Sequence, residues 1–280
     1  MTPTLYILTF INTILSFIRI VLSSKIKITF PVIYDKNLHI LGNGPSLADV
    51  DFQNLKGDLM AVNNFAFSEK YQETKPLYYI INAPEFWMEN VDDEYKSGRK
   101  NLTDALVKKT DWNVNFLVPV EAKNSGFTND LMANNNFSIF YYNITPIEGF
   151  SVLTSFFYNK KLGMPRPHNV LIPSIMNGIW MGYNSIFIHG ADHSWLKDIY
   201  VSQDNKVFLT QKHFYDFHSA KPEVMKKLGK GQRKMHEILE KFVLTFKGYH
   251  EINEFANRKK IKIFNCTKDS FIDAFERFTM

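Results

Sequence analysis

The sequence predicts an α/β fold built on a mainly parallel, Rossmann-like sheet with helices on both faces. Short apolar runs alternate along the chain with segments of helical length, which is the pattern of βαβ units. The 280 residues suffice for one large domain with a small appendage. With 45% hydrophobic and 22% charged residues, the chain has the composition of a packed globular protein.

Seven apolar runs are expected to form the strands of this sheet. In chain order they are Leu38–Leu41, Leu59–Val62, Tyr78–Ile81, Phe116–Val118, Ile139–Tyr142, Ser185–His189 and Ile261–Phe264. Helices are expected at Val170–Tyr183 and, disturbed by two glycines, at Lys221–Phe246. The polar stretch Lys197–Lys212 has no clear period, so we expect a loop there, within a lid segment around 195–220.

Residues 1–30 are expected to form an N-terminal amphipathic helix, ahead of a Rossmann-like domain at 36–280. The apolar run 5–22 is interrupted at intervals of three or four residues by Thr9, Asn12, Thr13, Ser16 and Arg19, which share one helical stripe. An unpaired Arg is costly inside a spanning helix. The pattern favours a helix lying in the membrane interface, with Lys25 and Lys27 near anionic headgroups. Packing on the protein's own core is the alternative.

Composition and charge exclude several classes of site. The net charge of +5 suits an anionic ligand or membrane surface, but the basic residues are spread out and form no nucleic-acid motif. Cys266 is the only cysteine, which excludes an internal disulfide and a cysteine-based metal site. The acidic pairs at Asp49/Asp51 and Asp92/Asp93 make no convincing metal triad.

The first strand runs directly into Gly42-Asn43-Gly44-Pro45-Ser46-Leu47. Glycines at such a turn allow close approach of the backbone, and N–H groups at the start of a following helix favour phosphate. The order of residues departs from the G-x-G-x-x-G fingerprint. A simple tight turn is the alternative interpretation.

Asparagine follows each of the first three strands. Asn43 lies in the glycine turn, Asn63-Asn64 ends the second strand and Asn82 ends the third. Asparagine is a poor strand former, so local propensity does not account for the repetition. The carboxyl edge of an open α/β sheet is where ligands bind. The three asparagines therefore predict a binding site at this edge.

Later segments add candidates for charge recognition and proton transfer. Arg166 precedes His168-Asn169, where Asn169 is expected to cap a helix and Arg166 to make an anion site. The strand Ser185–His189 is followed by Gly190, Asp192 and Ser194, but no G-x-S-x-G elbow supports a hydrolase. His213 and His218 flank an aromatic cluster, and a neutral imidazole can act as a general base. Ordinary core or turn roles remain the alternative for each residue alone.

Between Leu38 and Ser219 these motifs resemble the bacterial sialyltransferases of glycosyltransferase family 42. The shared features are the strand leading to G-N-G-P-S-L, the Asn-polar-aromatic segment Asn63-Asn64-Phe65, the turn at Asn82 and the Gly-x-Asp of 190–192. The resemblance implies a GT-A-like variant of the Rossmann fold with a lid, a CMP-sialic-acid-type donor, inversion at the anomeric carbon, and neither metal nor cofactor.

The same resemblance implies roles for single residues. Gly42, Gly44 and Ser46 would form the donor turn, with Asn43, Asn63 and Asn82 holding the nucleotide and its phosphate and with Gly190 and Asp192 holding the ribose or base. Tyr200 would stabilise the departing phosphate, whereas Ser194 replaces the family's second tyrosine. His168-Asn169 replace a Thr-Ser pair that grips the sugar carboxylate. The base would be His213 or His218, and we favour His213 because it lies nearer the lid.

These observations predict transfer of an acidic sugar from a CMP donor to a cell-surface glycan, such as lipooligosaccharide or capsule, at the cytoplasmic face of the inner membrane. The expected partners are the nucleotide sugar, the acceptor glycan and the membrane, without nucleic acid; an oligomer is compatible with the sequence. Two alternatives remain. The G-N-G-P-S-L motif also occurs in pterin pyrophosphokinase-like proteins, and the chain could be a non-catalytic nucleotide-sugar-binding subunit of a polysaccharide assembly.

Overall fold

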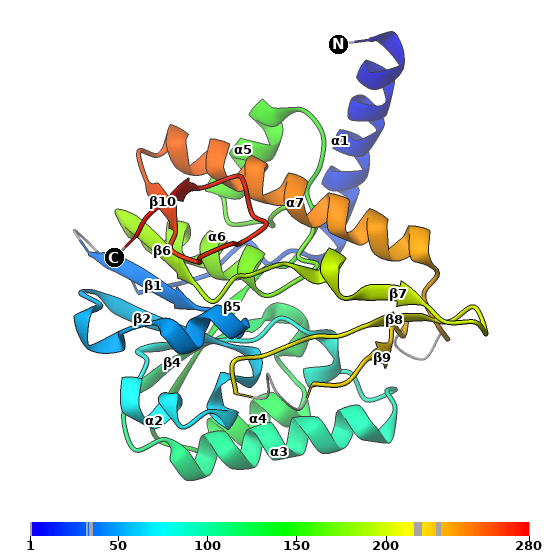
Figure 1. The fold of residues 1–280 in the computed structure, drawn as a ribbon. Helices are drawn as coiled ribbons and strands as arrows, with labels where there is room; N and C mark the ends of the chain where they lie inside the picture. Colours follow the sequence, from blue (N-terminus) through cyan, green and yellow to red (C-terminus); the bar gives the residue numbers. More distant parts are fainter. Residues whose placement is uncertain (1, 32, 34–35, 216–219, 228–230, 280) are drawn as a thin grey trace.

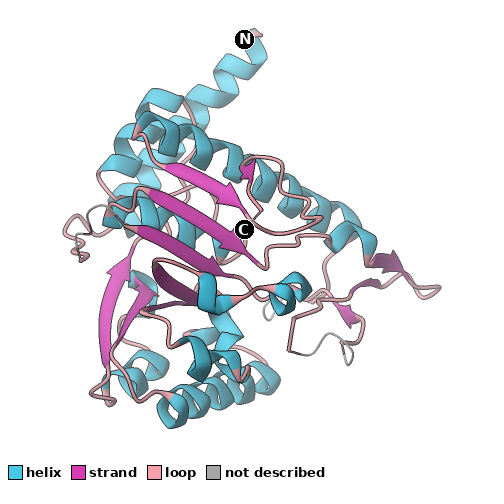
Figure 2. Cartoon of the chain, turned by 60° about the vertical axis from the view of Figure 1, so that its left-hand side comes forward, coloured by secondary structure: helices cyan, strands magenta, loops and turns pink. Residues whose placement is uncertain are grey.

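A twisted eight-stranded sheet forms the centre of the molecule (Figures 1 and 2). The computed structural model describes residues 2–31, 33, 36–215, 220–227 and 231–279. The strand order is β11-β10-β6-β1-β2-β3-β4-β5, and every neighbouring pair is parallel. The strands are β1 (Asn37–Leu41), β2 (Asp58–Val62), β3 (Tyr78–Ile80), β4 (Val114–Pro119), β5 (Phe137–Tyr142), β6 (Ser185–His189), β10 (Lys262–Asn265) and β11 (Glu276–Arg277). The predicted fold class is therefore confirmed.

Helices cover both faces of this sheet. The α-helices are α1 (Pro3–Ser23), α2 (Lys70–Thr74), α3 (Asp93–Lys109), α4 (Gly126–Met132), α5 (Ser151–Asn159), α6 (Leu171–Met181) and α7 (Met235–Arg258). Short 3-10 helices are η1 (Pro45–Asp49), η2 (Phe52–Asn54), η3 (Asn63–Phe67), η4 (Pro84–Phe86), η5 (Val120–Ala122) and η6 (Trp195–Lys197). In Figure 1, α5, α6 and α7 lie on the side from which α1 rises, and α3 and α4 lie on the opposite side.

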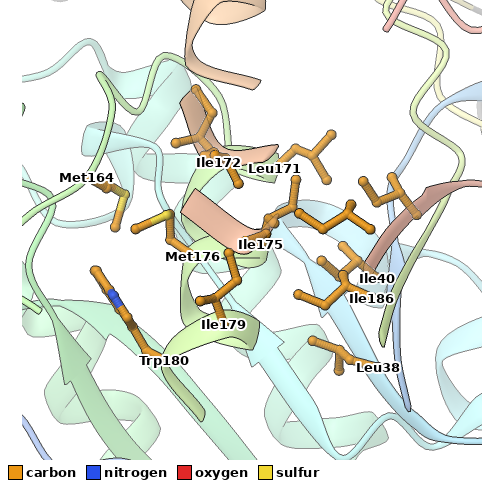
Figure 3. Packing of buried hydrophobic residues seen from close by; sticks show 14 of the residues in the cluster. Leu38, Ile40, Met164, Leu171, Ile172, Ile175, Met176, Ile179, Trp180 and Ile186 are labelled. Carbon is orange, nitrogen blue, oxygen red and sulfur yellow. The ribbon is translucent and has the colours of Figure 1, made fainter. Parts of the chain in front are cut away.

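Alternate residues of each central strand face opposite layers, as the period of two in a strand requires. On β1, Leu38 and Ile40 join the core with α6, whereas Leu41 joins the core with α3 and α4. Figure 3 shows Leu38, Ile40 and Ile186 of the strands beside the apolar side chains of α6. All eleven residues of α6 are buried. Burial on both faces explains why these strands are continuous apolar runs in the sequence.

All seven expected strands are present, with ends that shift by no more than two residues. The expected helix at 170–183 is α6, which ends at Gly182 with φ +94. The second expected helix begins later than predicted, because residues 223–224 form a short strand, β9 (Glu223–Val224), and α7 starts only at Met235. Residues 228–230, including Gly229, lie outside the described residues.

The expected loop at 197–212 is instead largely a β-hairpin, so that prediction is corrected. Strand β7 (Ile199–Val201) pairs antiparallel with β8 (Val207–Leu209), and β9 completes a small separate sheet. The polar Ser-Gln-Asp-Asn centre is the turn of the hairpin, with Asn205 at φ +57. Val207 and Leu209 pack with Ile238 and Phe242 of α7. That contact with a distant helix stabilises a hairpin whose local sequence is mostly polar.

The N-terminal helix forms as predicted and extends away from the body in Figure 1. Its polar stripe faces the protein, since Ser16 Oγ donates to the carbonyl of Glu148 at 2.8 Å and Arg19 forms an ion pair with the Glu148 carboxylate at 3.2 Å. Its apolar side is exposed. The helix thus docks on the protein through the polar atoms of its stripe and through Ile20, which is buried in the hydrophobic core.

The sheet has one topological switch point, between β1 and β6, among the described strands. Strands β2 to β5 continue on one side of β1, whereas β6, β10 and β11 continue on the other. The loops that leave β1 and β6 consequently diverge to opposite faces and open a crevice at the carboxyl edge. This crevice lies between the G-N-G-P turn and the Gly-x-Asp segment.

Candidate functional site

The loops that follow β1 and β6 pack against one another through backbone contacts. Gly42 N donates to the His189 carbonyl and Gly44 N to the Gly190 carbonyl, both at 2.8 Å. A Cβ at Gly42 would lie 2.5 Å from the Gly190 oxygen, and one at Gly44 would lie 2.0 Å from Asp192 Oδ2. Only glycine fits at either position.

This packing corrects the expected role of the glycine turn. Phosphate is expected at the N–H groups that begin the helix after the turn, whereas the N–H groups of Gly42 and Gly44 pair with the β6 loop. Ser46 N donates to Asp192 Oδ1 at 3.3 Å, and the following helix is the five-residue η1 rather than an α-helix. The turn therefore shapes the pocket by close approach.

A pocket of about 190 Å³ opens at the switch point. It collects segments from the β1 loop, the end of β2, the start of α6, the β6 loop and the segment after β8. Nine predicted site residues line it, namely Gly42, Asn43, Gly44, Asn63, Asn169, Gly190, Asp192, Ser194 and His213. Residues that lie 170 positions apart in the chain are thus brought to one cavity.

Two of the three strand-end asparagines lie on the pocket wall. Asn43 Nδ2 donates to the Val62 carbonyl at 3.1 Å, whereas its buried Oδ1 has no hydrogen-bond partner within the described chain. Asn63 adopts a left-handed backbone with φ +44, a conformation that asparagine tolerates better than most residues. The amide oxygen of Asn43 remains available to accept a hydrogen bond.

Asn82 lies directly behind this wall rather than in the pocket lining. Its backbone N donates to Asn63 Oδ1 at 3.3 Å, and its Nδ2 donates to the carbonyls of Pro167 at 3.0 Å and Asn169 at 3.3 Å. Asn82 also lines a neighbouring cavity of about 290 Å³ together with Arg19 and Glu121. The three asparagines are therefore connected, but only two face the same cavity.

Asp192 is held in place by Ser46. Ser46 Oγ donates to Asp192 Oδ2 at 2.8 Å, in addition to the contact from the Ser46 backbone. Burial raises the pKa of Asp192, and the hydrogen bonds from Ser46 work in the opposite direction. The carboxyl group is thereby oriented at the pocket edge, where it can accept a hydrogen bond from a ligand hydroxyl.

Asn169 links the start of α6 to a buried histidine. Its Oδ1 accepts from the backbone N–H groups of Leu171 and Ile172, at 3.0 and 3.2 Å, so the predicted cap is confirmed. That contact fixes the amide, and Nδ2 donates to His193 Nε2 at 3.2 Å and to the Tyr249 hydroxyl at 2.6 Å. Burial lowers the pKa of His193 to about 3. His193 is therefore neutral, with the lone pair on Nε2 engaged.

His213 reaches the pocket through the segment that follows the β7–β8 hairpin. Phe214 N donates to the Asn43 carbonyl at 3.0 Å, and Phe214 packs 5.6 Å from Phe65. The His213 ring stacks on Tyr215 at 5.2 Å. These contacts fix the segment over the G-N-G-P turn and place the imidazole on the pocket wall. His218, the other predicted base, lies outside the described residues.

The pocket also contains polar residues that the sequence did not single out. Lys212 and Asp198 both line it and form an ion pair at 2.6 Å. Trp195 supplies an aromatic wall and lies 4.1 Å from the His193 ring. Thr210 and Gln211 complete this side. The hairpin brings these residues to the pocket. In the sequence, only the position of Lys212 next to His213 could have indicated that they line it.

Arg166 is engaged by another residue of the protein. Its Nε and Nη2 donate to the two oxygens of Glu148 at 2.6 and 2.8 Å, and Arg19 approaches the same carboxylate. Burial of Glu148 opposes ionisation, but the two arginines outweigh it and lower the pKa of Glu148. This network ties α1 to the segment before α6, and Arg166 is not among the pocket-lining residues.

His168 lies near several cationic side chains. Burial lowers the pKa of His168 to about 4, with further lowering from the charges of Lys241, Arg166 and Arg233. Burial likewise lowers the pKa of Lys241, as does Arg233, with Glu85 acting in the opposite direction. His168 Nε2 is buried without a hydrogen-bond partner in the part of the chain that the structure describes. The positive potential here suits an anionic group.

Tyr200 and Asn64 lie away from the pocket lining. Tyr200 is 48% exposed on β7, where its ring stacks on Phe208 at 5.5 Å. Asn64 is partly buried in η3 beside Asn63. Contact between Tyr200 and a ligand in the pocket would require the hairpin to move.

Chemically, the pocket combines amide and carboxylate acceptors, an imidazole, a lysine and an aromatic wall. Among the described residues, no group of three or more His, Cys, Asp or Glu side chains is arranged to hold a metal ion. The arrangement suits a polar ligand with hydroxyl groups and a negative charge, with His213 available for proton transfer.

Comparison with known proteins gives similarity at the level of solved structures. No protein-family model matches the chain, and no curated protein matches it significantly. The chain is similar to the sialyltransferase CstII from Campylobacter jejuni in complex with the substrate analogue cytidine-5'-monophosphate, with a TM-score of 0.43 and 16% identity over 89% of this chain and 86% of that one. The sialyltransferase CST-II in complex with a trisaccharide acceptor and CMP gives a TM-score of 0.41 and 16% identity, over 88% and 86%.

Proposed function

We propose that this chain is an inverting, metal-independent glycosyltransferase that moves sialic acid or a related acidic sugar from a CMP donor to a glycan acceptor. One observation carries the proposal: the G-N-G-P turn and the Gly-x-Asp segment, the two motifs that resemble family 42 sialyltransferases, line one pocket at the switch point of the sheet. Asn43 and Asp192 present acceptors to it from opposite sides of the switch point.

The nucleotide would occupy the side of the pocket formed by the β1 and β6 loops. Asn43 Oδ1 would accept a hydrogen bond from the base or ribose, which would offset the cost of leaving that oxygen unpaired. Asp192, already oriented by Ser46, would accept from a ribose hydroxyl. Trp195 offers a flat surface for the ring system.

The chemical step would use His213 as the general base. Its imidazole takes the proton from an acceptor hydroxyl while that oxygen forms a bond to the anomeric carbon. The bond from the anomeric carbon to the phosphate oxygen breaks on the opposite face, and the electron pair leaves with CMP. Lys212 lies on the pocket wall, and its ammonium would turn from Asp198 to the departing phosphate to supply positive charge in place of a metal ion. Attack opposite to the leaving group inverts the anomeric centre.

The cations around His168 support an acidic sugar as the group transferred. His168 immediately precedes the pocket-lining Asn169, and Lys241 and Arg233 create a positive potential around it. A carboxylate bound here would pair with this positive charge. Nε2 of His168, in the same segment, is buried without a hydrogen-bond partner among the described residues. Arg166, engaged with Glu148, would act indirectly by supporting the segment. The acceptor is proposed to be a cell-surface glycan such as lipooligosaccharide or capsule.

Turnover of nucleotide sugars tests the proposal. The purified chain is incubated with CMP-N-acetylneuraminic acid, other CMP-sugars and a galactose-terminated oligosaccharide in EDTA, and CMP release and glycan product are measured. We expect transfer in EDTA, and we expect His213→Ala to lower kcat by a factor of about 10² to 10⁴, the range for loss of a general base. His236→Ala, which changes an exposed histidine, serves as the matched control.

Three outcomes would reject this function. Absence of CMP release and of product with every CMP-sugar would remove the donor assignment. A strict need for magnesium and ATP would instead indicate a pyrophosphokinase-like phosphotransferase, and unchanged function of a His213→Ala and His218→Ala chain in cells would indicate a non-catalytic binding subunit.

A further inference from the structure

The outer surface of α1 is made of large apolar side chains that the protein does not cover. Among the described helices, α1 alone is long and apolar enough to cross a membrane, and little of it is buried. Twelve of its large apolar residues are 41–79% exposed: Leu5, Tyr6, Ile7, Leu8, Phe10, Ile11, Ile14, Leu15, Phe17, Ile18, Val21 and Leu22. Exposure of so large an apolar surface to water is energetically unfavourable.

This apolar surface covers more than half of the helix circumference. At 3.6 residues per turn, the positions from Tyr6 to Leu22 spread over an arc of roughly 200°. The remaining arc, here called the polar arc, holds Thr9, Asn12, Thr13, Ser16 and Arg19, together with Leu5 and the buried Ile20. A partner that approached from one direction would cover only part of so wide a convex surface, whereas lipid surrounds a helix on every open side.

The polar arc of α1 is committed to the body of the protein. Ser16 Oγ exchanges hydrogen bonds of 2.8 Å with both the N–H and the carbonyl of Glu148. Thr13 Oγ1 accepts from Phe150 N at 3.0 Å, and a Cβ at Gly149 would lie 2.1 Å from that oxygen. Such close contacts hold the helix at a fixed rotation, with its apolar arc outward.

Helix α5 continues the apolar surface beside α1. Val152 is 77% exposed, Leu153 41% and Phe156 51%. The ring of Tyr6 lies 5.3 Å from that of Phe150, the residue directly before α5. In Figure 1, α5 lies on the side of the molecule from which α1 rises. The exposed apolar residues of α1 and of α5 are together called the α1–α5 face.

Basic side chains border the α1–α5 face. Arg258 of α7 donates to the Ser151 carbonyl at 3.3 Å and to the Ser155 hydroxyl of α5, while Glu254 balances its charge at 3.6 Å. Lys160 lies over the Phe156 ring at 5.8 Å, and Lys259 is close enough to Lys161 to lower its pKa, after the larger effect of burial. Glu251 lies in the same cavity as Arg258 and Glu254, so Lys160, Lys161 and Lys259 supply the positive charge that can meet anionic headgroups.

We propose that the α1–α5 face inserts into one leaflet of a membrane rich in anionic lipid while the polar arc of α1 stays docked on the protein. The apolar side chains enter the boundary between headgroups and acyl chains, and the basic border contacts the lipid phosphates. The helix is neither a free amphipathic segment nor an isolated spanning helix. This inference does not depend on the reaction proposed above.

Vesicle flotation of the full chain tests the proposal. Vesicles of phosphatidylcholine mixed with phosphatidylglycerol are compared with phosphatidylcholine alone. We expect the chain to float with the mixed vesicles, and we expect Ile14→Glu with Ile18→Glu to abolish flotation. Lys160→Glu with Lys259→Glu should weaken binding to the mixed vesicles by at least roughly thirtyfold while leaving the weaker binding to phosphatidylcholine unchanged.

A matched control introduces the same charges on the opposite side of the molecule. Val107 of α3 and Met132 of α4 are 45% and 54% exposed, so Val107→Glu with Met132→Glu should float like the unaltered chain. Equal loss of flotation in this control would attribute the effect to net charge and overturn the proposal. Urea unfolding verifies that each variant remains folded.

A probe on α5 distinguishes insertion of the whole face from insertion of α1 alone. An NBD label is attached at Val152→Cys in a Cys266→Ser chain, and its emission is measured with and without vesicles that contain doxyl-lipid quenchers. We expect a blue shift and quenching at this position. Water-like emission on bound vesicles would contradict the proposal, as would a vesicle-independent dimer that Ile14→Glu with Ile18→Glu converts to a monomer.

Discussion

Unsatisfied polar atoms gather around the pocket and the segment that precedes α6. Asn43 Oδ1, Asn82 Oδ1 and His168 Nε2 are buried without a hydrogen-bond partner within the described residues. An unpaired buried acceptor costs about 1–3 kcal/mol, so three in one region represent stability given up locally. A ligand in the pocket that donates a hydrogen bond to Asn43 Oδ1 would offset part of this cost, whereas Asn82 and His168 lie outside the pocket lining.

Lys212 and Tyr200 are the two candidates to stabilise the departing phosphate, and their positions predict opposite effects of substitution. Lys212 lines the pocket, whereas Tyr200 stacks on Phe208 outside it. We expect Lys212→Met to lower kcat by a factor of about 10² to 10³, the range for a lost charge-stabilising donor. Tyr200→Phe should change kcat less than tenfold if the hairpin keeps its observed position. Steady-state rates with a CMP-sugar measure both, and a larger loss for Tyr200→Phe would show that the hairpin closes.

Gly44 is predicted to be intolerant of a single methyl group. The added Cβ of Gly44→Ala would lie 2.0 Å from Asp192 Oδ2 and 2.7 Å from the Gly190 carbonyl, so the β6 loop would have to shift. We expect a loss of about 1–3 kcal/mol in the free energy of unfolding, together with weaker nucleotide binding.

Gly98 supplies the matched control for that substitution. It is exposed within α3, and a Cβ there meets nothing within 4 Å. Because alanine is the better helix former, Gly98→Ala should raise the free energy of unfolding by about 0.5–1 kcal/mol. Urea denaturation compares the two variants, and equal stability of Gly44→Ala and the unaltered chain would contradict the close packing of the two loops.

At the scale of elements, the β7–β8 hairpin carries one wall of the pocket. It is attached to α7 through a small cluster in which Val207 and Leu209 meet Ile238 and Phe242. Asp198 precedes the hairpin, and Thr210, Gln211 and Lys212 follow it. The position of these pocket residues therefore depends on a contact with a helix that begins more than twenty residues later.

Loosening this contact should open the pocket wall. Leu209 is 2% exposed, and Leu209→Ala removes buried side-chain volume worth about 2–5 kcal/mol. We expect amide exchange across 199–209 to accelerate at least thirtyfold and the KM for the donor to rise. Val201→Ala, at a position 48% exposed on β7, should leave both unchanged. If amide exchange across 199–209 in Leu209→Ala kept the rate of the unaltered chain, α7 would not be what holds the hairpin.

The same elements show how far the sequence predicts this structure. The strands were predictable because burial on both faces leaves continuous apolar runs between turn residues, and the asparagines at their ends marked the carboxyl edge. The β7–β8 hairpin was not predictable, because its stability comes from Val207 and Leu209 packing on α7 rather than from a local sequence pattern. Similarly, no sequence period indicates that Arg166 pairs with Glu148 or that Lys212 turns into the pocket.

At the scale of the whole molecule, buried histidines couple stability to pH. His39 and His189 lie on adjacent central strands with Nδ1 of one 3.0 Å from Nε2 of the other. Burial lowers the pKa of His189 to about 3, with a further effect from His39, and burial lowers the pKa of His39. Both imidazoles are neutral in the folded protein. Unfolding frees His189 to titrate near its usual value of about 6.5.

The sign of the pH dependence follows from that depression. The unfolded chain binds the proton more tightly, so the contribution of His189 is fully present above pH 6.5 and is lost as the pH falls towards 3. At pH 5 the loss amounts to about 2 kcal/mol from this residue. His189→Gln should therefore reduce the difference in urea midpoint between pH 7 and pH 5, whereas His236→Gln should not. An unchanged difference in His189→Gln would show that the buried pair does not dominate acid sensitivity.

We propose that the crevice between β1 and β6 binds a cytidine nucleotide without a metal ion. Calorimetric titration of the chain with CMP in EDTA tests it most directly, using Asn43→Ala, which removes the unpaired acceptor, and Asn64→Ala as the neighbouring control outside the pocket lining. We predict saturable binding by the unaltered chain and by Asn64→Ala, weakened at least tenfold in Asn43→Ala. No binding of CMP, or equal affinity in all three proteins, would contradict the account.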